Sequence, residues 1–114
     1  MAKSDIEQNQ REHYRINYPE LERPQLQVGK VVYKVLDVSE RGIRFLLPAQ
    51  HGHIENQVVK GTLVFRSGKR VAIEGKIIRI MPLELTCSLH LKRSIPLAYI
   101  MEEQRILLQK YNEL

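Results

Sequence analysis

Apolar and polar residues alternate in several short segments of the chain, and each such segment predicts a β-strand. Residues 30–39 and 42–47 are rich in β-branched and apolar side chains and are separated by only two residues, which is hairpin spacing. The second segment has one mainly apolar face, formed by Ile43, Phe45 and Leu47. Residues 48–57 contain glycine, proline and polar residues and are predicted to be a loop.

A second hairpin is predicted farther along the chain. Residues 60–66 and 70–81 are strand-like and are separated by Ser67-Gly68-Lys69, a turn signal. The clearest alternation lies in residues 85–92, where Leu85, Cys87, Leu89 and Leu91 share one face. Five or six short strands at this spacing indicate an antiparallel sheet that closes into a small barrel or a sandwich.

The period of the apolar residues changes near the end of the chain. Apolar residues recur there at helical spacing, which predicts an amphipathic helix over about residues 96–112, with Pro96 in its first turn. Residues 1–10 are polar and of mixed charge, and we expect a flexible segment there. The predicted fold is all-β with one C-terminal helix, in a single domain over residues 11–114.

Composition and charge narrow the function classes. The 114 residues are 43% hydrophobic and 27% charged, and 18 basic residues against 13 acidic ones give a net charge of +5. This positive charge favours anionic partners such as nucleotides. The single cysteine excludes an intrachain disulfide, and no apolar segment is long enough for a secretory signal or a bilayer span. We therefore expect a cytoplasmic protein without membrane insertion.

Residues that could support catalysis or bind a metal are scarce. The sequence has no glycine-rich phosphate loop and neither an HExxH nor a GxSxG motif, so we expect no enzyme and no catalytic residues. His51 and His53 lie in a predicted loop and are interpreted as loop surface, so no metal ligands are assigned. Cys87 alternates with leucines and is interpreted as a buried, unreactive thiol.

Two polar motifs are the best candidates for a binding site. REHYR places Arg11 and Arg15 four residues apart, and DVSERG places Asp37 and Ser39 on one side of a predicted strand, followed by Gly42. Taken singly, the first is a solvated terminus and the second an ordinary hairpin turn. Together they supply what an anionic guanine nucleotide requires: arginines for phosphate and for guanine O6 and N7, and a carboxylate for the guanine N–H donors.

This pair of motifs, in this order and on this strand pattern, resembles the PilZ domain family over about residues 10–112. The family pattern is RxxxR followed about twenty residues later by [D/N]xSxxG. PilZ domains are small β-barrels that bind the bacterial second messenger cyclic di-GMP. The resemblance implies an antiparallel six-stranded β-barrel with a C-terminal helix, and a ligand in place of a cofactor.

The resemblance also implies a role for each motif residue. Arg11 and Arg15 would fold over the ligand and contact guanine and phosphate. Asp37 and Ser39 would bind a guanine edge from the barrel surface, and Gly42 would leave room for the ligand.

Two further residues are possible contacts. Gln10 precedes RxxxR at a position where the family often has an arginine or an apolar residue, and that position influences whether one or two ligand molecules bind. Arg79 follows the apolar pair Ile77-Ile78 and lies either near the pocket or on a strand surface. The last strand lacks the Gly-x-x-Phe-like pattern that is frequent in the family, which we interpret as divergence in barrel packing.

The expected function is a non-enzymatic cyclic di-GMP receptor that signals to a protein partner, as a monomer or weak homodimer. One alternative is a PilZ-like adaptor that binds a protein but not the nucleotide. Another is a small basic barrel that binds single-stranded nucleic acid. The sequence has no tryptophan, two phenylalanines and five scattered tyrosines, which is few for the stacking surfaces of that class, so we expect no specific nucleic-acid partner.

Overall fold

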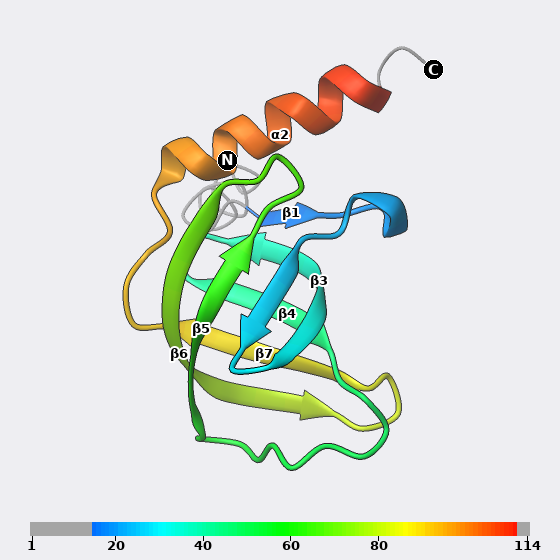
Figure 1. Cartoon of the computed structure of the whole chain (residues 1–114), viewed down its shortest axis with the longest axis vertical. Coiled ribbons are helices and arrows are strands. Elements are labelled where there is room, and N and C mark those ends of the chain that lie inside the picture. Colours follow the sequence, from blue (N-terminus) through cyan, green and yellow to red (C-terminus); the bar gives the residue numbers. More distant parts are fainter. Residues whose placement is uncertain (1–14, 112–114) are drawn as a thin grey trace, which may run out of the picture.

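A computed structural model describes residues 15–111, which form one antiparallel sheet, a short 3-10 helix and a C-terminal helix. Figure 1 shows the sheet curved into a barrel, with the helix lying across one end beside β1. In chain order the elements are β1 (Arg15–Asn17), η1 (Glu20–Glu22), β2 (Gln25–Val28), β3 (Val31–Ser39), β4 (Gly42–Leu46), β5 (Val58–Val64), β6 (Arg70–Met81), β7 (Thr86–Leu91) and α2 (Leu97–Tyr111).

Six strands close the barrel. Going round it, β3 pairs with β2, followed by β5, β6, β7 and β4, and β4 pairs with β3 again. Closure leaves few backbone groups unpaired at sheet edges, which makes a small barrel stable without a second layer. The predicted six-stranded antiparallel barrel with one C-terminal helix is therefore confirmed.

The two predicted hairpins are the β3–β4 and β5–β6 pairs, and the predicted loop over residues 48–57 contains no strand or helix. The helix also lies where it is predicted. Two strands are absent from the prediction, the three-residue β1 and the four-residue β2. Both strands alternate polar and apolar residues, but three or four residues are too few for that alternation to predict a strand. Each is held by pairing with β3.

The barrel interior is filled by side chains that alternate along the strands. Cys87 lies among them, and burial raises the pKa of its thiol to about 11, so it is protonated and unreactive at neutral pH. The strand side chains with at most 1% of their surface exposed in this core are Leu26, Val35, Val38, Ile43, Phe45, Leu63, Ile77, Cys87, Leu89 and Leu91. Ile95 and Ile100, from the β7–α2 connection and α2, are buried to the same degree.

A β-bulge in β3 reverses which residues face the core. Val35 pairs with Phe45 whereas Asp37 pairs with Arg44, so β3 advances two residues while β4 advances one. Val35 is in the core before the bulge and Val38 is in the core after it. Because of this reversal, Asp37 faces away from the core although it is two residues from Val35.

Polar contacts attach α2 to the segment around β1. The hydroxyl of Tyr18 donates to Glu103 at 2.9 Å. Glu22 in η1 accepts hydrogen bonds from Lys110 at 2.6 Å and from the hydroxyl of Tyr111 at 3.0 Å. In the part of the chain that the structure describes, no helix is long and apolar enough to cross a membrane.

Glu103 makes stability depend on pH. Burial raises the pKa of this carboxyl above its ordinary value of 4.5, and the hydrogen bond from Tyr18 does not fully offset the effect. A raised folded-state pKa stabilises the protein below pH 4.5, and that contribution is lost as the pH rises through the folded-state value. In Glu103→Gln this loss is absent, so we expect the variant to gain stability relative to wild type as the pH rises.

Urea unfolding of both proteins at a series of pH values measures this difference. Glu84→Gln, which replaces an exposed carboxylate in the β6–β7 turn, is the matched control. Its difference in unfolding free energy from wild type should not change with pH. A stability difference between Glu103→Gln and wild type that stays flat or shrinks with rising pH would contradict the role assigned to burial.

Candidate functional site

The β1–β3–β4 part of the sheet brings the two sequence motifs together. Arg15 of REHYR is the cross-strand partner of Ser39, and Asn17 is the partner of Asp37. Directly opposite residues on an antiparallel pair have side chains in contact distance. The last arginine of RxxxR therefore lies directly opposite the strand that carries Asp37 and Ser39. Arg11 and Gln10 precede the described residues.

Asp37 is the electrostatic centre of this surface. Its side chain is only 2% exposed, and each carboxylate oxygen is held by an arginine. Arg15 donates from Nη1 to Oδ1, and Arg44 donates from Nε to Oδ2 at 2.8 Å. A buried carboxylate needs such partners because an unpaired charge is costly to remove from water. Asp37 thus fixes the positions of two arginines.

A surface pocket of about 300 Å³ opens beside these groups. Its charged lining consists of arginines, and Asp37, which contacts two of them, is not part of the lining, so the pocket favours an anion. Arg41 also lines the pocket, and its buried Nε has no hydrogen-bond partner among residues 15–111. The lining residues are Arg15, Ser39, Arg41, Gly42, Ile43, Arg44, Ile78, Ser88, Leu89 and His90.

Gly42 keeps this pocket open. A Cβ at this position would lie 3.3 Å from the Ser39 hydroxyl, 3.4 Å from the Leu89 carbonyl oxygen and 3.8 Å from Nη2 of Arg15. A side chain at this position would therefore occupy the space between Ser39 and the Arg15 guanidinium. The absence of one leaves space where Arg15 Nη2 and the hydroxyl can meet a ligand.

Arg79 lies on the same outer face but farther round the barrel. It is the cross-strand partner of Ser88, which in turn is the partner of Arg44. Arg79 is exposed and does not line the pocket. The structure thus places it two strands away from the Asp37–Arg44 pair.

Sequence reasoning does not include Arg44, Arg41, Ser88 and His90 among the candidate site residues. A signal for Arg44 is present, because it alternates with Ile43 and Phe45 and must face outward on β4. What the sequence does not show is its pairing with Asp37. That pairing depends on the bulge in β3.

His53, Phe45 and Phe65 have structural roles in the described part of the chain. His53 accepts from or donates to the Tyr33 hydroxyl at 2.8 Å, which ties the 48–57 loop to the barrel. Within residues 15–111, no three or more histidine, cysteine, aspartate or glutamate side chains are grouped to hold a metal ion. Phe45 and Phe65 are buried, so neither offers a stacking face to a single-stranded nucleic acid.

Comparison with protein-family models gives a match over most of the chain. The family model described as the PilZ domain matches residues 9–109. This range includes both motifs, the whole barrel and most of α2. No curated protein matches the chain.

Proposed function

Because the chain belongs to the PilZ domain family, a family that binds cyclic di-GMP, we propose that it is a cyclic di-GMP receptor and not an enzyme. The observation that carries this proposal is the position of Arg15, which pairs with Ser39 and contacts Asp37 beside a pocket lined by arginines. A cyclic dinucleotide carries two phosphates and two guanines, and arginine is suited to both groups.

In the proposed complex, the arginines bind the ligand and Asp37 holds them in place. Arg15 gives one donor, Nη1, to Asp37, and the guanidinium has further N–H donors for phosphate or guanine. Ser39 supplies a hydroxyl at the pocket wall. Asp37 itself is covered by Arg15 and Arg44, so it reaches a guanine edge only if one of these two side chains moves. Arg11 completes the RxxxR pair from outside the described residues.

Receptor function also requires an output. We propose that ligand binding changes how the RxxxR segment lies on the barrel and so changes the surface presented to a protein partner. β1 links this segment to α2, because Tyr18, which follows β1, bonds to Glu103. The protein acts in this proposal as a monomer or a weak homodimer in the cytoplasm.

Isothermal titration with cyclic di-GMP tests the proposal, with GTP and cyclic di-AMP as controls. We expect saturable binding of cyclic di-GMP and much weaker binding of both controls. Cyclic di-AMP lacks the O6 acceptor and the N1–H and N2 donors of guanine, and GTP carries one guanine in place of two. The molar ratio at saturation decides between one ligand and two, the question raised by Gln10. Absence of binding would favour the adaptor alternative, in which the fold contacts a protein without the nucleotide.

A further inference from the structure

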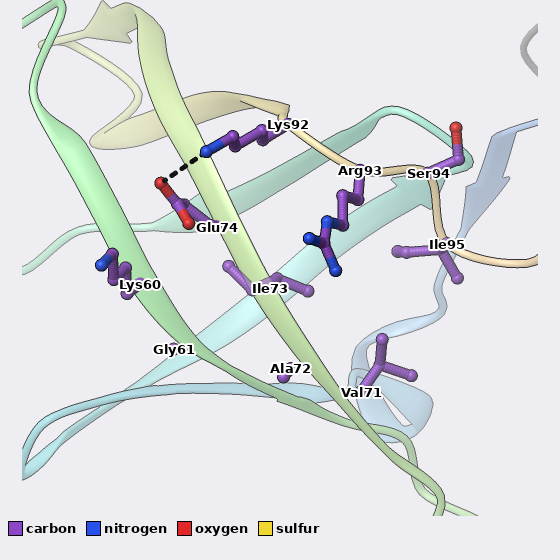
Figure 2. Close-up of a pocket in the computed structure, with 10 residues that line it drawn as sticks. All are labelled: Lys60, Gly61, Val71, Ala72, Ile73, Glu74, Lys92, Arg93, Ser94 and Ile95. Carbon is purple, nitrogen blue, oxygen red and sulfur yellow. Dashed lines mark ion pairs between the residues drawn. The ribbon is translucent and has the colours of Figure 1, made fainter.

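A second hollow, of about 510 Å³, lies on a different part of the barrel. Figure 2 shows its walls: β5 and β6 on one side, and the connection from β7 to α2 on the other, from which Arg93 and Ile95 extend toward β6. None of its lining residues lines the pocket beside Asp37. We call it the β6 groove. Its lining residues are Lys60, Gly61, Val71, Ala72, Ile73, Glu74, Lys92, Arg93, Ser94 and Ile95.

The β6 groove follows a stretch of strand with one unpaired edge. Residues 70–74 of β6 pair with β5 on one side. On the other side β7 pairs only from Gly75 onward, so residues 70–74 have no strand partner there within the described chain. One more backbone bond, from Lys92 N–H to the Glu74 carbonyl at 2.8 Å, ends the contact before the chain turns away.

The direction of the unpaired groups follows from that last bond. The Glu74 carbonyl faces β7, and backbone groups of alternate residues in a strand face the same neighbour. The N–H and carbonyl of Ala72 therefore point away from β5 and toward the groove. An edge of this kind is a template for another extended chain.

Charge and apolar surface restrict what can occupy this edge. The groove is lined by three cations, Lys60, Lys92 and Arg93, and by one carboxylate, that of Glu74. Oε2 of Glu74 lies 3.9 Å from Nζ of Lys92. Apolar lining comes from Val71, Ile73 and Ile95. A strand beside β6 would present alternate side chains to these two kinds of surface.

We propose that the β6 groove binds an extended, acidic segment of a protein partner, which adds as a strand to the edge at Ala72. A nucleotide is a poor fit because no aromatic side chain lines the groove to stack a base. A second copy of this chain, paired through the same edge, would bring like-charged rims together. Binding here does not require the nucleotide, so the inference stands apart from the proposed receptor function.

The probe is a fluorescent peptide of alternating glutamate and valine, followed by anisotropy. We expect this peptide to bind, and its affinity to fall as salt is added. A peptide of alternating lysine and valine should not bind. Ala72→Pro should weaken binding at least about tenfold, because proline removes the edge N–H but no bond to β5. Arg93→Glu should weaken it by a similar factor through its charge. Lys34→Glu, an exposed charge reversal on β3 outside the groove, should bind as wild type does.

Amide exchange on the wild-type protein avoids any effect of substitution on folding. The Ala72 amide should exchange more slowly when the glutamate–valine peptide is bound. Arg15→Ala should bind cyclic di-GMP weakly but should bind the peptide as wild type does. This variant therefore tests the groove independently of the nucleotide site.

The proposal would be overturned by a peptide that fails to bind, or by one that binds equally well to wild type, Ala72→Pro and Arg93→Glu. Unchanged exchange at Ala72 in the saturated complex would also overturn it. A dimer in sedimentation velocity that Ala72→Pro dissociates would show that a second copy of the chain occupies the edge instead.

Discussion

Arg15→Ala is expected to weaken cyclic di-GMP binding by at least about a hundredfold. The substitution removes a guanidinium that is 46% exposed beside the pocket and held toward it by Asp37. Hydrogen bonds to charged groups contribute about 1.5–3 kcal/mol each, so the loss of two corresponds to about a hundredfold in the dissociation constant. Isothermal titration of variant and wild type measures the change, and Arg11→Ala is expected to have a similar effect.

Two further variants test whether the loss of affinity is specific to the Arg15 guanidinium. Arg105→Ala removes an exposed guanidinium from α2, away from the pocket, and should bind the ligand as wild type does. Arg15→Lys keeps the charge but not the planar fork and should lie between wild type and alanine. Wild-type affinity in both Arg15→Ala and Arg11→Ala would show that the RxxxR segment is not the ligand site.

Gly61→Ala is expected to lower the free energy of unfolding by about 3 kcal/mol. A Cβ at Gly61 would lie 2.4 Å from the backbone oxygen of Gln27 and 3.0 Å from the Val28 side chain. The oxygen belongs to β2, which is paired on both sides, so it cannot move without disturbing the barrel. Overpacking of this kind costs about 1–3 kcal/mol, and contact with backbone places Gly61 at the upper end. Urea unfolding gives the value.

Gly52→Ala provides the contrast. Gly52 lies in the 48–57 loop, and a Cβ there would have no heavy atom within 4 Å. Its replacement should leave the free energy of unfolding unchanged or raise it by about 0.5 kcal/mol, because alanine lowers the conformational entropy of the unfolded chain. Equal urea midpoints for Gly61→Ala and wild type would mean that β5 and β2 do not approach as closely as the structure shows.

The alternation of apolar and polar residues identified the longer strands, because enough consecutive residues in them alternate between the core and the solvent. Ile43, Phe45 and Leu47 were predicted to face the core and are buried, and Cys87 is fully buried as the alternation in β7 indicates. β2 could not be predicted, because Gln25–Val28 contributes only Leu26 to the fully buried core. Its strand conformation depends on β3 and β5, which are its partners on either side.

By itself the sequence indicated a small antiparallel barrel or sandwich, the two hairpins, the terminal helix and the residue types of the candidate site. The resemblance of its two motifs to the PilZ family favoured the barrel. Those features depend on periodicity and motif spacing, which are local properties of the chain. Only the tertiary structure decided that Arg15 pairs with Ser39, that Arg44 shares Asp37 with it, and that β6 keeps an open edge at Ala72. The bulge at Leu36 and the early end of β7 produce these arrangements. Both arise from fitting unequal strands into one closed barrel, a constraint that no short segment contains.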